Sequence, residues 1–136
     1  MRKILFRGKR ADNKEWCFGD LLQVPSKNFC SIIEQKSLAT NRTVKAETVG
    51  QYTGLTDKNG KKIYEGDIVK HFNNCGDDYD IGEIYYDTEF VGWRRTTNGK
   101  FHNKTLILTY KLNPNCIYEV IGNIHDNPEL LKEGVK

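Results

Sequence analysis

Residues Val49 to Val69 have the sequence VGQYTGLTDKNGKKIYEGDIV, and they are the strongest indicator of the fold. Two short apolar segments flank Asp57-Lys58-Asn59-Gly60, which predicts a tight turn because Asn and Gly tolerate the left-handed backbone of a hairpin. A new strand is expected to begin at Glu65-Gly66-Asp67. The stretch contains no nucleophile beside a base and no metal-ligand spacing. It therefore predicts a fold and leaves the activity open.

The rest of the chain continues this pattern of short strands and turns. Strands are predicted at residues 3–7, 15–23, 29–34, 67–72, 81–87, 90–95, 104–112 and 117–123. Residues 36–43 are polar and predict a loop, and residues 46–48 predict a single helical turn. Residues 105–110 are apolar at almost every position, which favours a central strand covered on both faces. Residues 127–129, Asn-Pro-Glu, predict a short helix that ends at 132 or 133, because Asn caps a helix and Pro fits its first position.

These elements together predict a mainly β fold. Several short strands with Gly turns and one terminal helix favour a small β-barrel or roll. A chain of 136 residues fits one domain, or two small parts that share a core. We expect a single unit over residues 1–136, with an N-terminal β portion at 1–48 and a barrel portion with the terminal helix at 49–136.

The composition predicts a thin, aromatic-rich core. Hydrophobic residues make up 38% of the chain and charged residues 29%, while aromatic residues reach 11%. A thin core gains from association with further copies, so a homo-oligomer is expected.

Cysteine spacing and hydropathy indicate a cytoplasmic protein. The four cysteines, Cys17, Cys30, Cys75 and Cys116, form no C-x-x-C pair. The apolar run after Met1 is too short for a signal sequence, and no run approaches the ~20 residues of a membrane span, so no membrane partner is expected. An extracellular scaffold with two disulfides is the alternative.

Charge is distributed unevenly along the chain. The net charge is only +3, which is well short of the balance of a dedicated nucleic-acid-binding protein. The first 50 residues and residues 90–118 are basic, and an acidic stretch lies between them: Asp77, Asp78, Asp80, Glu83, Asp87 and Glu89. These opposed patches suit a head-to-tail contact between subunits as well as they suit an anionic partner.

Three blocks of the sequence resemble the YopX-like family of phage and prophage proteins. They are Val49–Val69, Tyr118–Leu131, and an opening Phe6-Arg7-Gly8 followed by Trp16-Cys17-Phe18-Gly19-Asp20. The chain departs from the family pattern at Ala46, where the family more often has Pro. The resemblance implies a phage-encoded protein with an SH3-like barrel in its C-terminal part, a tendency to form homo-oligomers, and no established catalytic residues.

One basic and aromatic run is a candidate binding surface for nucleic acid or a protein partner. Its members are Phe90, Trp93, Arg94, Arg95, Lys100, Phe101, His102 and Lys104. Aromatic rings can stack on bases while cations pair with phosphates, and small β-barrels can carry such surfaces. The alternative interpretation places Trp93 and Phe101 in the core, on either side of a charged hairpin at Thr97-Asn98-Gly99.

Evidence for a metal site or an enzyme is weaker. His71, Cys75, Asp77, Asp78 and Asp80 could be drawn as a metal site, but the spacing is loose for zinc and wrong for an EF-hand, so a solvated acidic loop is preferred. Glu65 and Asp67 could act as paired carboxylates, but turn formation explains them more simply. His102 and His125 stand alone, and no cofactor is predicted.

The leading hypothesis is thus a non-catalytic module that self-assembles and binds host or phage macromolecules. Direct nucleic-acid binding through residues 93–104 is the second, and a metal-dependent enzyme is the third.

Overall fold

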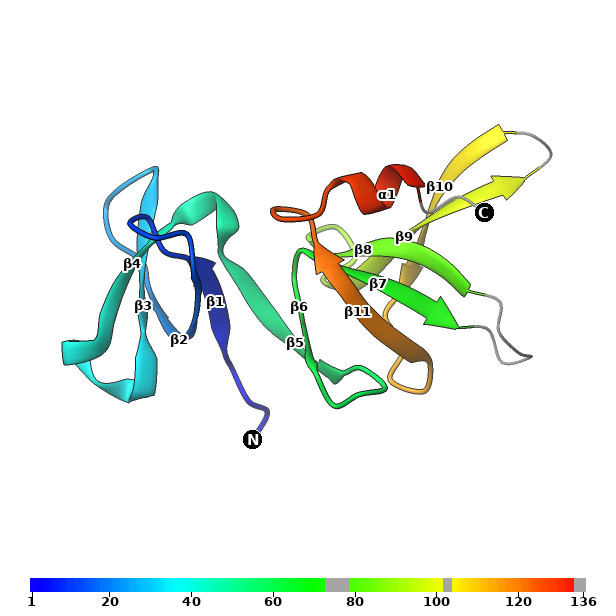
Figure 1. The fold of residues 1–136 in the computed structure, drawn as a ribbon. Coiled ribbons are helices and arrows are strands. Elements are labelled where there is room, and N and C mark those ends of the chain that lie inside the picture. Colours follow the sequence, from blue (N-terminus) through cyan, green and yellow to red (C-terminus); the bar gives the residue numbers. More distant parts are fainter. Residues whose placement is uncertain (73–78, 102–103, 134–136) are drawn as a thin grey trace. The chain divides into compact units, whose positions relative to one another are not determined.

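The computed structural model describes residues 1–72, 79–101 and 104–133, without the side chains of 38, 98–101, 104–109 and 132–133. The chain divides into two compact units, Met1–Gly54 and Leu55–Lys136. Its strands form two antiparallel sheets, which confirms the predicted mainly β fold (Figure 1). Within the described residues, no helix has the length and apolar character needed to cross a membrane. The division at residues 48 and 49 stays a prediction.

The first unit is built on strands β1 (Phe6–Lys9), β2 (Trp16–Leu22), β3 (Phe29–Ile33), β4 (Asn41–Lys45) and the beginning of β5 (Gly50–Thr56). The strand order of its sheet is β4-β3-β2-β1-β5-β6, with antiparallel neighbours from β4 to β5. Three 3-10 turns complete it: η1 (Glu34–Lys36), η2 (Leu38–Thr40) and η3 (Ala46–Thr48). The last of these confirms the predicted helical turn.

The predicted loop at 36–43 was wrong at its end, because β4 begins at Asn41. This strand has the sequence Asn-Arg-Thr-Val-Lys, so its one buried apolar side chain, Val44, creates no visible alternation. Pairing with β3, from Phe29↔Lys45 to Ile33↔Asn41, makes it a strand. Tertiary pairing has therefore overridden a polar local sequence.

The core of the first unit is small. Cys17, Ile32 and Val44 are buried, and partly buried apolar side chains pack around them. A Cβ on Gly8 would lie 2.8 Å from Cγ2 of Val44, so the backbone of β1 itself covers this core. A bridge between Arg10 and Val44 brings the end of β1 back to β4.

The second unit contains β6 (Lys62–Tyr64), β7 (Asp67–Phe72), β8 (Tyr79–Asp87), β9 (Gly92–Phe101), β10 (Lys104–Lys111), β11 (Ile117–Asn123) and the helix α1 (Glu129–Glu133). The strand order of its main sheet is β10-β9-β8-β7-β11 (Figure 1). The core consists of Ile63, Val69, Ile84, Leu112 and Tyr118. The predicted strand at 117–123 and the predicted terminal helix are confirmed.

Two predictions for this unit were wrong. Thr97-Asn98-Gly99 lies inside β9, paired with Leu106–Leu108 of β10, and forms no hairpin. The apolar strand β10 stands at the end of the sheet order, so it is no central strand. An apolar run indicates that a strand is favourable, but the position of that strand in the sheet depends on which distant strands it pairs with.

The pairings among the described residues leave both sheets open. The first sheet ends in β4 and β6, and the second in β10 and β11. The SH3-like barrel stays a prediction.

Candidate functional site

The turn at Asp57 organises the fold of the second unit. One carboxylate oxygen of Asp57, Oδ1, accepts hydrogen bonds from the backbone N–H groups of Asn59 and Lys61, both at 2.9 Å. The other, Oδ2, accepts one from the N–H of Val120 at 3.0 Å. Burial acts to raise the pKa of Asp57, but these donors and the charge of Lys61 outweigh it and lower the pKa. This carboxylate therefore joins the turn to β11.

The second half of the Val49–Val69 stretch, Glu65-Gly66-Asp67, is also structural. Gly66 has a φ of 90°, which a residue with a Cβ adopts only with strain. Oδ2 of Asp67 accepts the N–H of Tyr64 at 2.7 Å, and only 1% of Asp67 is exposed. A carboxylate enclosed in this way closes the turn between β6 and β7 and has no access to a substrate.

The two arginines of the predicted nucleic-acid surface lie on opposite faces of β9, because successive strand residues alternate. Trp93 packs against the core, in line with the alternative interpretation for that residue. The guanidinium of Arg94 lies 4.8 Å from the ring centroid of Phe90, and its Nε is 3.8 Å from Oδ2 of Asp87. The side chains of Lys100, Phe101 and Lys104 and the whole of His102 fall outside the described residues. Among the described side chains, Arg94 and Arg95 do not share a face, and the binding surface as a whole stays a prediction.

Arg95 belongs to a buried polar cluster on β7, β8 and β9. Its Nη1 donates to Oδ1 of Asp80 at 2.7 Å, and its Nη2 lies 3.2 Å from Nδ1 of His71. A guanidinium has only donors, so Nδ1 of His71 must be the acceptor and the imidazole is neutral. Burial lowers the pKa of His71, and the charge of Arg95 lowers it further against the opposing effect of Asp80.

This cluster also bears on the predicted metal site. Nδ1 of His71 faces Arg95, and no group of three His, Cys, Asp or Glu side chains among the described residues could hold a metal ion. Cys75, Asp77 and Asp78 fall outside the described residues. Burial raises the pKa of the Cys17 thiol to about 11, so this cysteine is protonated at neutral pH and is a poor nucleophile.

His71 should make stability depend on pH. Because the pKa of His71 is lowered in the folded protein, the unfolded chain binds more protons once the pH falls below about 6.5. The contribution of neutral His71 to the free energy of unfolding is complete above that pH. It is lost as the pH falls toward the folded-state pKa of His71. We expect His71→Gln, which keeps an acceptor for Arg95, to remove this component. Urea unfolding of both proteins from pH 7.5 to 5 measures it, and parallel curves would contradict it.

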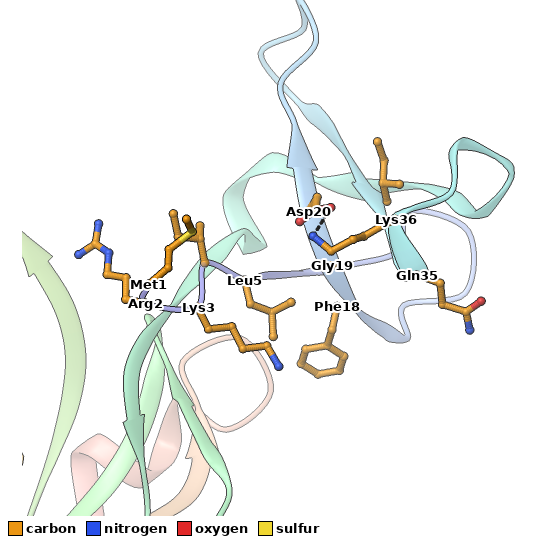
Figure 2. A pocket seen from close by; sticks show the side chains of 11 residues that line it. Met1, Arg2, Lys3, Leu5, Phe18, Gly19, Asp20, Gln35 and Lys36 are labelled. Atoms are coloured by element: carbon orange, nitrogen blue, oxygen red, sulfur yellow. Dashed lines mark ion pairs between the residues drawn. The ribbon is translucent and has the colours of Figure 1, made fainter.

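A groove of about 610 Å³ lies in the first unit, lined by residues 1–5, 18–20, 33, 35 and 36. We call it the N-terminal groove. Figure 2 shows Leu5 and Phe18 facing the same space, with Lys3 beside them. Phe18 is 46% exposed although it stands in the middle of β2. At the rim, Nζ of Lys36 is 3.8 Å from Oδ2 of Asp20. The groove thus combines apolar walls with a largely cationic rim.

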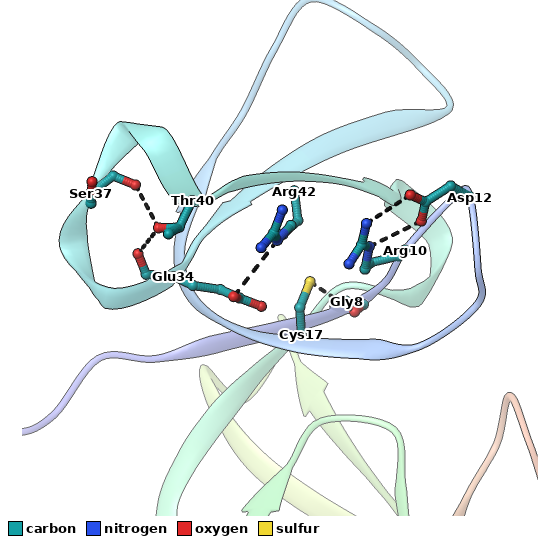
Figure 3. A network of polar contacts seen from close by, with 8 residues as sticks. All are labelled: Gly8, Arg10, Asp12, Cys17, Glu34, Ser37, Thr40 and Arg42. Carbon is teal, nitrogen blue, oxygen red and sulfur yellow. Dashed lines mark hydrogen bonds and ion pairs between the residues drawn. The ribbon is translucent and has the colours of Figure 1, made fainter.

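Backbone packing shapes this groove. A Cβ on Gly19 would lie 2.1 Å from the carbonyl oxygen of Ile33, so only Gly allows β2 to meet η1. Gln35 and Lys36 have φ values of 52° and 54°, a left-handed conformation that turns the chain sharply. The hydroxyl of Thr40 donates to the carbonyls of Glu34 and Ser37, which holds the turn (Figure 3).

Side chains also hold the rest of this unit in shape. Arg42 pairs with Glu34 at 3.7 Å, and Arg10 forms two hydrogen bonds with Asp12 (Figure 3). Sequence reasoning missed the groove because its walls come from three separate segments. The available signal was Phe18, which shares a mostly apolar strand face with Trp16 and Leu22, opposite the face of Cys17.

The second unit exposes an apolar tip. The turn Asp87–Gly92, which we call the β8–β9 turn, joins β8 to β9. Phe90 is 69% exposed and Val91 is 74% exposed. Val91 has a φ of 50°, an uncommon conformation for a β-branched residue. Oδ1 of Asp87 accepts the N–H groups of Glu89 at 2.9 Å and Phe90 at 3.3 Å, so the turn is held in one shape.

Comparison with known proteins supports the family resemblance. The family model described as YopX protein matches residues 5–132, which is nearly the whole chain. The chain belongs to the YopX family. A search among curated proteins finds no match. Among solved structures, this YopX protein is similar to protein EF1440 from Enterococcus faecalis, at 24% identity over 96% of this chain and 99% of that chain, with a TM-score of 0.49.

In this YopX protein, the described contacts of Asp57 and Asp67 in the Val49–Val69 stretch hold the fold together. Its departure at Ala46 also has a local consequence. The N–H of Ala46 donates to the carbonyl of Asn28 at 2.9 Å, and a Pro has no such donor. Here the link between β3 and η3 includes a hydrogen bond that Pro could not form.

Proposed function

We propose that this YopX-family protein is a non-catalytic, self-assembling interaction module of phage or prophage origin that acts in the bacterial cytoplasm. Its second unit serves as an SH3-like scaffold, and its first unit carries the binding surface. The observation that supports this best is the N-terminal groove, where Phe18 is nearly half exposed beside Leu5.

A half-exposed aromatic side chain in a hollow favours association. Covering the rest of such a ring gains on the order of 1–2 kcal/mol, and neighbouring apolar walls add to that. Gly19 keeps the strand close to η1, so the groove exists before a partner arrives. A preformed site loses little conformational entropy on binding.

The cationic rim indicates a partner segment with apolar and acidic residues. Lys3 and Lys36 lie at the groove, and the one acid there, Asp20, already pairs with Lys36. Nucleic acid is a less favoured partner, because Arg95 is enclosed by Asp80 and His71 and its side chain is only 6% exposed.

Assembly through this groove predicts a mass well above that of one chain. We expect light scattering to give at least twice 15.7 kDa for the wild-type protein. Phe18→Ser should weaken association at least tenfold, because it removes the exposed ring from the groove. Leu22→Ser is the matched control, since Leu22 is on the same strand and 42% exposed but does not line the groove.

A wild-type protein that stays monomeric up to high micromolar concentration would refute self-assembly. Equal effects of Phe18→Ser and Leu22→Ser would show that the groove is not the contact surface. Thermal unfolding of each variant confirms that it is folded.

A further inference from the structure

The β8–β9 turn has the properties of a docking element. Phe90 and Val91 expose most of their apolar surface at its tip. Asp87 holds the turn through two backbone N–H groups, and the guanidinium of Arg94 covers the Phe90 ring at 4.8 Å. Val91 keeps a left-handed backbone conformation that costs free energy, and such strain concentrates at binding and active sites. The tip is thus hydrogen-bonded at its base, apolar and strained.

The chemistry of the tip complements that of the N-terminal groove. The groove offers apolar walls at Leu5 and Phe18 with cations at its rim. The turn offers apolar side chains next to the exposed carboxylate of Glu89, while its other acid, Asp87, is engaged with Arg94. Glu89 is therefore the acid available to the cationic rim of a partner, to Lys3 directly and to Lys36 in exchange for Asp20. Such complementarity fixes orientation and selects against wrong partners.

We propose that the β8–β9 turn of a second copy of this chain occupies the N-terminal groove. This inference rests on the proposed function and names the partner segment. Phe90 and Val91 enter beside Phe18, and Glu89 pairs with the cationic rim. The groove and the tip are different surfaces of one chain, so each contact joins the tip of one copy to the groove of another. Two copies that exchange tips reciprocally close as a two-fold dimer, and otherwise the contacts continue as a ring or an open chain.

Complementation between two defective variants tests this arrangement. Phe18→Ser has a defective groove and an intact tip, whereas the double variant Phe90→Ser, Val91→Gly has an intact groove and a defective tip. Each variant alone should be monomeric. Mixed in equal amounts, they should form a 1:1 dimer and nothing larger, because each pair retains one intact groove and one intact tip. Light scattering and native mass spectrometry measure this.

Charge reversal provides a second measurement on the same contact. Glu89→Lys should weaken association at least tenfold. When this variant is mixed with a second copy that carries Lys3→Glu or Lys36→Glu, at least part of the lost affinity should return. Ile117→Ser is the matched control for the tip variants, because Ile117 is also exposed in the second unit but lies outside the turn. It should leave the mass unchanged.

The outcomes separate this inference from the proposed function. If the wild-type protein assembles and the tip variant assembles equally well, the inference is overturned and self-assembly stands. If Phe18→Ser abolishes assembly but the mixture does not complement, the groove binds a different segment and the inference is overturned. If the wild-type protein is monomeric, the proposed function fails together with the inference. Both also fail if the tip occupies the groove of its own chain. Crosslinking would then give an intrachain product.

Discussion

Asp57→Asn should lower the free energy of unfolding of the second unit by about 3 kcal/mol at pH 7, because hydrogen bonds to a buried charged group contribute about 1.5–3 kcal/mol each. Asn keeps one acceptor oxygen for Asn59 and Lys61 but places an NH₂ group where Oδ2 of Asp57 accepts the N–H of Val120. Two donors then face each other, and the link between the turn and β11 is lost.

The same substitution should change the response to acid. The pKa of Asp57 is lowered in the folded protein, so its contribution is complete above the unfolded-state value of about 4. That contribution is lost as the pH falls through the folded-state pKa. The Asn variant has no such component and should show a smaller loss of stability between pH 5 and pH 2.

Urea unfolding followed by fluorescence measures both effects. The control is Glu119→Gln, which breaks the neighbouring ion pair between Nζ of Lys58 and Glu119 at 2.9 Å. A partly exposed ion pair contributes about 1 kcal/mol or less, so this variant should stay close to the wild type. An Asn variant as stable as the control at pH 7 would show that the Asp57 carboxylate does not hold the turn.

Gly82→Ala should be the most damaging single change in the main sheet of the second unit. A Cβ at this position would lie 1.6 Å from the carbonyl oxygen of Thr96 and 2.6 Å from its carbonyl carbon. Both atoms belong to the backbone of β9, which pairs with β8 and with β10 and cannot move alone. We expect a loss of about 3 kcal/mol or more, the range of severe overpacking.

Gly92→Ala is the matched control for this prediction. Gly92 begins β9, and the nearest atom to a Cβ there, the carbonyl oxygen of Phe90, is 3.8 Å away. Its φ is outside the left-handed region, so Ala should be neutral or slightly stabilising, by less than about 1 kcal/mol. Circular dichroism and urea unfolding compare the two. Failure of Gly82→Ala to fold agrees with the expectation, and equal stability of the two variants would rule it out.

Much of the fold was predictable because its signals are local. The turn at Asp57–Gly60 depends on residues that tolerate a left-handed backbone, and Gly60 has a φ of 81°. The helix at Glu129–Glu133 begins directly after Asn127-Pro128, as expected from their capping preferences. Strand β11 was predicted with its observed bounds, since Ile117–Asn123 is flanked by turn residues. In each case the deciding residues are neighbours in sequence.

Errors arose where distant residues decide the structure. Strand β4 has one buried apolar residue and is formed by pairing with β3. Strand β10 is apolar, but its place at the end of the sheet depends on the pairing of β9 with β8. The adjacent Arg94 and Arg95 suggested one cationic surface, yet a strand turns them to opposite faces and Asp80 takes up Arg95.

Sequence patterns were enough to assign the family, from its three matching blocks, and the mainly β class with its principal turns, which depend on short-range backbone preferences. The roles of the charged and exposed residues emerged only where distant segments pack together. Asp57 became a link to Val120, 63 positions away, and Phe18 became a wall of a groove because β2, η1 and the N-terminal segment meet there. Whether a side chain is buried, and which groups it contacts, depends on segments that are far apart in the sequence and meet only in the folded protein.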